Sequence, residues 1–146
     1  MTPTIKLVDK PGLEVWSAIG DPLKQMDDAR FDRIDPFSGF ALTLVAPESG
    51  EIIGGLWGEI ARDYLCIDLL FVPEAARGRG VGRSLMHQAE QEAVRRGCHA
   101  VWLSTYSFQA PGFYQKLGYR VFGELLAYPR DQSTIFLTKT LMPEAG

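Results

Sequence analysis

The sequence has few of the residues that build metal sites and disulfides. It contains two cysteines, Cys66 and Cys98, and two histidines, His87 and His99, in 146 residues. None of the four stands in a CxxC, HExxH or comparable metal-ligand spacing, so we expect no metal. We expect both thiols to be reduced, which is typical of a cytoplasmic protein. Each cysteine is expected to be a small buried residue rather than a nucleophile.

Three further absences narrow the possible partners and the location of the protein. The 15 basic and 18 acidic residues leave a formal net charge of -3, whereas nucleic-acid-binding domains are usually strongly basic. No apolar run approaches the roughly 18 residues of a transmembrane helix. The opening stretch, MTPTIKLVDK, lacks the apolar core of a signal peptide. We expect no nucleic-acid partner, no membrane association and a cytoplasmic location.

Hydrophobic periodicity predicts an α+β fold. The length suits a single domain over residues 1–146, and no repeat or linker divides the chain. Two short helices are expected within 13–32, separated by Gly20-Asp21-Pro22, because an N-cap followed by proline signals a helix start. Further helices are expected at 82–96 and about 109–117. Strands are expected at 4–8, 40–46, 51–60, 64–72, 100–106, 119–128 and 133–141.

The middle of the chain predicts one parallel crossover. Residues 64–72, YLCIDLLFV, form a nearly continuous apolar run, which is typical of a strand buried on both faces. A helix at 82–96 would connect this strand to the one at 100–106 in a right-handed βαβ unit. The other strands follow one another closely and favour antiparallel pairing. We therefore expect a mixed, mostly antiparallel sheet with a central parallel unit.

Glycine and arginine concentrate just before the helix predicted at 82–96. Residues 77–84 read RGRGVGRS. Both the dinucleotide fingerprint GxGxxG and the P-loop pattern require glycine where this chain has Arg83. Glycines before a helix N-terminus nevertheless let backbone N–H groups approach an anion, and arginines add charge-assisted contacts. The stretch therefore predicts a phosphate or pyrophosphate site.

These residues resemble a known family. Residues 77–82 match the Q/R-x-x-G-x-G/A signature of the GNAT superfamily of acetyl-CoA-dependent N-acetyltransferases. LLFVPEAARGRGVG and FYQKLGYRVFG are similar to its strand–loop and F-Y-x-x-x-G-F segments. The resemblance implies the GNAT-like acyl-CoA N-acyltransferase fold, with helices on both faces of the sheet. It also implies direct transfer of an acetyl group from acetyl-CoA to a primary amine of a small molecule or peptide.

The resemblance assigns residues to the acetyl-CoA co-substrate. It places the pantetheine arm along the backbone of Leu70, Phe71 and Val72, with an oxyanion-binding N–H near Leu70. Ser107 stands where the family often has an asparagine that contacts CoA. The pyrophosphate contacts are expected from the whole glycine-arginine stretch: Arg77, Gly78, Arg79, Gly80, Val81, Gly82, Arg83 and Ser84.

Tyr114 stands at the tyrosine position of the family. A tyrosine with a pKa near 10 is protonated at neutral pH, so it can give a proton to the departing thiolate. The resemblance therefore implies that Tyr114 is the catalytic acid. The competing interpretation is an aromatic side chain packed in the core. We expect Phe113, beside it, to pack in that way.

The sequence leaves the general base open. Asp68 lies in the middle of an apolar run, where a carboxylate is costly unless it is paired. It could be the base, or it could be a structural aspartate held by hydrogen bonds or an ion pair. Glu59, Asp63 and a water chain are the alternatives.

The acceptor is expected to be chosen by residues 13–40, with help from Tyr106, Phe108 and Tyr128. Within that segment, acidic residues could attract a cationic amine and phenylalanines could form apolar walls: Asp27, Asp28, Asp32, Asp35, Phe31, Phe37 and Phe40. A merely solvated acidic surface is the alternative. The identity of the amine stays open.

Three hypotheses for the whole protein follow. The first is the acetyltransferase. The second is a non-catalytic module that binds or senses acyl-CoA, and the third is a nucleotide-binding domain. We also favour a homodimer over a monomer, because dimers are the commonest oligomers and the hairpin 119–141 could pair with a second copy.

Overall fold

The computed structural model describes residues 1–30, 38–128 and 130–141. It contains two compact units, Met1–Asp35 and Pro36–Gly146. Within the described residues, no helix is both long enough and apolar enough to cross a membrane.

The described residues of the first unit contain one helix, α1 (Leu13–Arg30), with Pro22 inside it. The prediction of two short helices is wrong, because the helix-favouring residues on both sides of Pro22 outweigh the loss of one backbone N–H donor. The strand predicted at 4–8 is also wrong. Residues 4–8 form neither a helix nor a strand.

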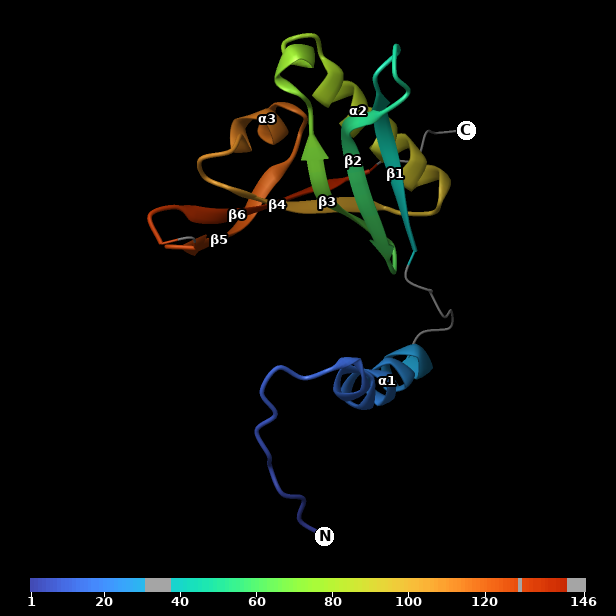
Figure 1. Cartoon of the computed structure of the whole chain (residues 1–146), viewed down its shortest axis with the longest axis vertical. Coiled ribbons are helices and arrows are strands. Elements are labelled where there is room, and N and C mark those ends of the chain that lie inside the picture. Colours follow the sequence, from blue (N-terminus) through green and yellow to red (C-terminus); the bar gives the residue numbers. More distant parts are fainter. Residues whose placement is uncertain (31–37, 129, 142–146) are drawn as a thin grey trace. The chain divides into compact units, whose positions relative to one another are not determined.

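The second unit is built on a six-stranded sheet with the order β1-β2-β3-β4-β6-β5 (Figure 1). The strands are β1 (Ser38–Val45), β2 (Ile52–Ala61), β3 (Tyr64–Phe71), β4 (Ala100–Tyr106), β5 (Arg120–Leu126) and β6 (Ser133–Thr140). The β3–β4 pair is parallel and all other pairs of this sheet are antiparallel. The predicted α+β class, with a mixed sheet and one parallel crossover, is confirmed.

The parallel pair is short, and its early end leaves an opening in the sheet. β3 and β4 pair from Tyr64 with Ala100 as far as Ile67 with Leu103. Beyond that point β3 stays paired with β2 through Phe71, and β4 stays paired with β6 through Tyr106. The sheet therefore opens between its two central strands while each strand keeps its outer partner.

The prediction that β3 is buried on both faces is wrong. In its first half only the face that carries Leu65 and Ile67 is buried, since Tyr64 is exposed and Cys66 is half-buried. In its second half, Asp68, Leu69 and Phe71 are exposed. An apolar run predicts burial only where neighbours cover it, and the second half of β3 has lost β4 as a neighbour.

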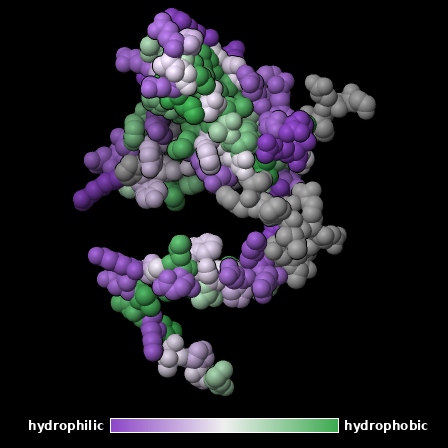
Figure 2. All heavy atoms as spheres, turned by 45° about the vertical axis from the view of Figure 1, so that its right-hand side comes forward, coloured by the Kyte–Doolittle hydropathy of each residue, from purple (hydrophilic) through white to green (hydrophobic). Residues whose placement is uncertain are grey.

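Apolar and hydrophilic side chains alternate in patches over the surface of this unit (Figure 2).

Helix α2 (Val81–Arg95) supplies the crossover from β3 to β4. Leu85, Met86, Ala89 and Ala93 recur at helical spacing and are buried against the sheet. Two short helices flank this crossover, the 3-10 turn η1 (Glu74–Ala76) before α2 and α3 (Pro111–Lys116) after β4. Proline begins α3, where its missing N–H removes no helical hydrogen bond.

A polar network joins α2 to the residues that follow α3. The buried Tyr119 donates its hydroxyl proton to Oε2 of Glu90 at 2.9 Å. Lys139 of β6 donates to Oε1 of the same carboxylate at 2.8 Å. Burial, followed by the charge of Glu90 and its hydrogen bond, raises the pKa of Tyr119, so the phenol stays protonated. The network fixes the end of α3 relative to α2.

Core packing near the opening predicts that two leucines of the β5–β6 hairpin contribute very differently to the free energy of unfolding. Leu137 is 0% exposed and Leu126 is 79% exposed. Leu137→Ala should lower the free energy of unfolding by about 3 kcal/mol, because it leaves a cavity in the core. Leu126→Ala should change it by less than about 0.5 kcal/mol. Urea unfolding of both variants measures the difference, and equal losses would contradict this packing.

Candidate active site

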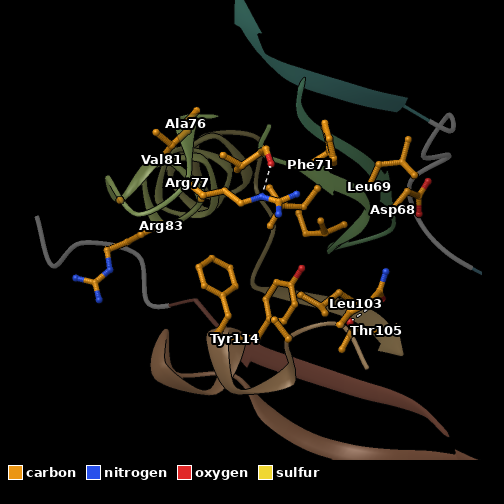
Figure 3. Close-up of a pocket in the computed structure, with 18 of the residues that line it drawn as sticks. Asp68, Leu69, Phe71, Ala76, Arg77, Val81, Arg83, Leu103, Thr105 and Tyr114 are labelled. Carbon is orange, nitrogen blue, oxygen red and sulfur yellow. Dashed lines mark hydrogen bonds between the residues drawn. The ribbon is translucent and has the colours of Figure 1, made fainter. Parts of the chain in front are cut away.

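A cavity of about 850 Å³ lies where β3 and β4 part (Figure 3). β3 contributes residues 67–71 to its lining, followed by Val72, and β4 contributes residues 103–105. The loop and first turn of α2, the two residues before α3, and Phe113 and Tyr114 within α3 complete the lining. This volume is within the range of ligand pockets, about 300–1,000 Å³. Because the two strands are no longer paired here, the inner edge of β3 lacks a strand partner along the cavity.

One end of the cavity is the N-terminus of α2. Gly78 and Gly80 take φ values of 79° and 75°, which glycine adopts readily. The first helical hydrogen bond runs from the Ser84 N–H to the Gly80 carbonyl, and none of the described side chains caps the helix. The N–H groups at the start of this helix are therefore available to an anion, in a first turn that carries no acidic residue.

The three arginines of the glycine stretch differ in their position relative to the cavity. Arg77 and Arg83 line the cavity, whereas Arg79 lies outside its lining. Arg77 donates from Nε to the Val72 carbonyl at 2.9 Å, which ties its guanidinium to the end of β3. Ser84 also lies outside the lining, and its Oγ accepts a hydrogen bond from Gln88. The other expected pyrophosphate residues, Gly78, Gly80, Val81 and Gly82, all line the cavity.

Tyr114 lines the cavity from α3, and its hydroxyl points towards the space below β3 (Figure 3). Its ring makes edge-to-face contacts with Phe113 and Tyr119, with centroids 5.0 and 6.1 Å apart. Burial raises the pKa of Tyr114 above its ordinary value of 10.0. A phenol in this environment keeps its proton at neutral pH and can act as a donor.

Ser107, expected to contact CoA, lies outside the cavity lining. Its hydroxyl donates to Oε1 of Gln132 at 2.8 Å and accepts from the Ser133 N–H at 3.0 Å. The side chain therefore joins the end of β4 to the start of β6. Gln109 lines the cavity instead, although no sequence motif singled it out. Its Oε1 accepts hydrogen bonds from Thr105 Oγ1 and the Tyr106 N–H, both at 2.9 Å.

Asp68 lines the cavity near the point where β3 leaves β4. It occupies an irregularity in the β2–β3 pairing, because Gly58 pairs with Ile67 while Trp57 pairs with Leu69. Such a bulge inserts one extra residue and re-aims its side chain. Apolar periodicity does not reveal a bulge, so this one could not be predicted from the sequence.

Glu59 of β2 forms a carboxyl pair with Asp68. A side-chain hydrogen bond with Asp68, then desolvation and then the charge of Asp68 raise the pKa of Glu59 above its ordinary value of 4.5. Two carboxyl groups this close share a proton more readily than they both ionise. Asp63, the third acidic candidate, lies in the turn between β2 and β3, at the far end of β3 from the cavity.

Cys66 belongs to the same polar cluster. Its thiol donates to Oδ1 of Asp68 with Sγ 3.3 Å from the oxygen. Desolvation, then the hydrogen bond with Asp68 and then the charges of Asp68 and Glu59 raise the pKa of Cys66 to about 12. The residue is thus a neutral thiol near neutral pH, in agreement with the expectation that it is not a nucleophile.

The residues expected to choose the acceptor lie in several different parts of the chain. Tyr106 and Phe108 are exposed and stack with ring centroids 5.4 Å apart, and Tyr128 is also exposed. Phe40 instead packs against the core, with the guanidinium of Arg96 over its ring at 4.9 Å. Asp27 and Asp28 belong to α1. Phe31, Asp32, Asp35 and Phe37 lie outside the described residues.

The described ranges 1–30, 38–128 and 130–141 contain no group of three or more His, Cys, Asp and Glu side chains placed to hold a metal ion.

Comparison with known proteins gives consistent matches. A blasticidin-S acetyltransferase of Streptomyces morookaense is 41% identical over 100 residues, covering 68% of this chain and 74% of the relative. An acetyltransferase of Agrobacterium fabrum is 36% identical over 133 residues, covering 91% and 96%. The crystal structure of an acetyltransferase from Bacillus cereus superposes with a TM-score of 0.83 at 32% identity, covering 93% of this chain and 98% of that one.

The family model for GNAT acetyltransferases matches residues 8–119, which include the glycine stretch and Tyr114. Solved structures that share the fold contain coenzyme A or acetyl-CoA. The motif, the divided sheet and these matches agree. The chain belongs to the GNAT family and is an acetyl-CoA-dependent N-acetyltransferase.

Proposed function

We propose that the protein transfers the acetyl group of acetyl-CoA to a primary amine by direct attack, within the cavity between β3 and β4. The observation that carries the proposal is the makeup of this one cavity. It combines an uncapped helix N-terminus with two arginines, an unpaired strand edge, a protonated tyrosine and a carboxylate. Each of these groups meets a separate need of the reaction.

The donor fits the cavity along its length. The start of α2, with Arg77 and Arg83, would hold the pyrophosphate through backbone N–H groups and charge-assisted contacts. The pantetheine arm is rich in amides, so it would pair with the backbone of Leu70, Phe71 and Val72 as an added strand does. These three residues line the cavity on the β3 edge that β4 has left.

The chemistry needs an acid and an oxyanion donor. The amine nitrogen attacks the thioester carbon, and the carbonyl oxygen becomes an oxyanion that a backbone N–H near Leu70 would stabilise. When the C–S bond breaks, the thiolate takes the proton of Tyr114. The attacking nitrogen then gives its second proton to the tyrosinate, which restores the phenol and leaves the neutral amide. The raised pKa of Tyr114 keeps that proton in place until the thiolate forms.

The base is proposed to be the carboxyl pair of Asp68 and Glu59. An amine reaches the enzyme as an ammonium and must lose a proton before it attacks. Asp68 lines the cavity and can accept this proton, while Glu59 behind it shares the resulting charge and proton through the side-chain hydrogen bond. A water chain is the alternative base, and replacing Asp68 distinguishes the two.

The acceptor is proposed to be a small molecule. The relative from Streptomyces morookaense is a blasticidin-S acetyltransferase by name, which favours a small amine over a peptide. Tyr106 and Phe108 form an exposed stacked pair at the end of β4 that could lie against an apolar part of such a molecule. A panel of small amines and peptides, with CoA release as the signal, tests this choice.

Replacing the acid gives the first kinetic prediction. Tyr114→Phe should lower kcat by about a hundredfold on an amine whose chemical step limits the rate, because proton donation typically contributes about 10²–10⁴-fold. The affinity for acetyl-CoA should change little. Tyr64→Phe, which removes an exposed phenol outside the cavity lining, is the matched control. Full turnover by Tyr114→Phe would show that another group donates the proton.

Replacing the proposed base, Asp68, gives the second kinetic prediction. Asp68→Asn should lower kcat/KM by about a hundredfold, and Asp63→Asn is the control. Because the pKa of Glu59 is raised above its ordinary value of 4.5, the activity of the unmodified enzyme should fall as pH drops through that raised value. The Asp68→Asn substitution would remove the carboxylate whose hydrogen bond and charge raise this pKa. A pH–rate profile for Asp68→Asn that matches the unmodified enzyme would indicate a water base.

Ligand binding separates the acetyltransferase from its alternatives. At a concentration of about 100 Kd, acetyl-CoA should stabilise the protein by about 2.7 kcal/mol. Thermal unfolding with acetyl-CoA, ATP and NAD measures this effect. Stabilisation by ATP or NAD alone would favour the nucleotide-binding hypothesis. Binding of acetyl-CoA without turnover on any amine would favour the non-catalytic module.

A further inference from the structure

We propose that Gly82 is a positioning residue for Tyr114. Its lack of a side chain lets Phe113 lie against the first turn of α2, and Phe113 in turn holds the ring of Tyr114 in the cavity. The inference rests on the proposed acid role of Tyr114. It gives Gly82 a different task from that of the two glycines before it.

The three glycines of the stretch differ in what they require. Gly78 and Gly80 have positive φ values, and a Cβ at either position would meet no described atom within 4 Å. They are needed for backbone conformation. Gly82 lies inside α2 and is not among the glycines with positive φ. Any residue could adopt its backbone conformation, so another constraint must favour glycine there.

That constraint is the side chain of Phe113. A Cβ on Gly82 would lie 3.2 Å from Cζ and 3.5 Å from Cε1 of Phe113, and 3.8 Å from Cγ2 of Val72. The nearest of these distances is shorter than a comfortable carbon–carbon contact, about 3.5–4.0 Å. An alanine would therefore push the Phe113 ring by a few tenths of an ångström. The GNAT signature accepts glycine or alanine here, so the need for glycine in this chain comes from Phe113.

A displacement of Phe113 would be passed to Tyr114. The two rings meet edge to face with centroids 5.0 Å apart. On its other side Tyr114 contacts Tyr119, which is held by its hydrogen bond to Glu90. Gly82 thus supports one end of a row of three aromatic rings whose other end is anchored to α2. Tyr114, in the middle, is the ring whose hydroxyl reaches the cavity (Figure 3).

The position of this row connects two parts of the site. Gly82 belongs to the helix turn that would bind the pyrophosphate, and Tyr114 would protonate the thiolate at the other end of the pantetheine arm. Val72, Gly82, Phe113 and Tyr114 all line the same cavity. A small change in the helix turn would therefore alter catalysis without altering a contact to the phosphates.

The experiment compares two acetyl donors, acetyl-CoA and acetyl-pantetheine, which lacks the pyrophosphate. Gly82→Ala should lower kcat by about fivefold with both donors, because a misplacement of about 1 Å can cost about a hundredfold and this one is smaller. The KM for acetyl-CoA should stay within about twofold. Gly80→Ala is the contrast, since its loss should be larger with acetyl-CoA than with acetyl-pantetheine.

A second replacement tests the contact itself. Phe113→Leu removes the ring atoms that the new methyl group would meet. Adding Gly82→Ala to Phe113→Leu should cause no further loss of kcat, whereas the effect in the unmodified enzyme is about fivefold. Urea unfolding of each variant checks that it folds, and alanine is well suited to a helix. An equal loss with and without Phe113 would overturn the inference.

The remaining outcomes separate this inference from the acid role on which it rests. A loss by Gly82→Ala that appears only with acetyl-CoA, as a raised KM, would overturn the inference and assign Gly82 to the phosphates. When Tyr114→Phe is slow, Gly82→Ala in that background should add no further loss, and a further loss of about fivefold would overturn the route through Tyr114. Full turnover by Tyr114→Phe would instead refute the acid role itself, whatever Gly82→Ala does.

Discussion

The active site depends on where the hydrogen bonding between β3 and β4 stops. The two strands pair as far as Ile67 and Leu103, and each then keeps its outer partner. The opening is therefore held on both sides by intact strand pairs, so it does not depend on loop flexibility. Backbone groups on the open edge of β3 need a partner. An amide-rich arm such as pantetheine can supply it, which supports the proposal that the donor binds at the break in the sheet.

The groups around this opening are arranged by charge. Arg77 and Arg83 lie by the start of α2, where the helix dipole adds positive potential, while Asp68 lies on the β3 side at the other end of the cavity (Figure 3). The hydroxyl of Tyr114 points into the space between them. An anionic donor and a cationic acceptor would thus be drawn to opposite ends. The carboxyl pair extends the negative end through Glu59, and Cys66 completes its hydrogen bonding.

Much of the unit could be read from local patterns, because helix caps, glycines and apolar periodicity act over a few residues. The crossover helix and the strands of the sheet lie within one or two residues of the predicted bounds, and the donor loop precedes the helix as expected. The sequence-based predictions were incomplete where a contact between distant parts of the chain decides the local structure. Residues 4–8 form no strand, and the extra residue at Asp68 exists only relative to β2. Ser107 stands where the family often has an asparagine, and its hydroxyl bonds Gln132 and the Ser133 N–H; its contact to CoA stays a prediction.

The sequence by itself determined the class of protein and the positions of the glycine-arginine loop and of Tyr114, since these depend on residue type and spacing along a contiguous stretch. Only the tertiary structure decided which other residues they lie against. It joined Glu59 to Asp68 across two strands, and it placed Phe113 against Gly82 across two helices. Both contacts connect residues that lie far apart in the chain or on different elements. Their effect on a pKa or a ring position follows from distance in space, which no local pattern encodes.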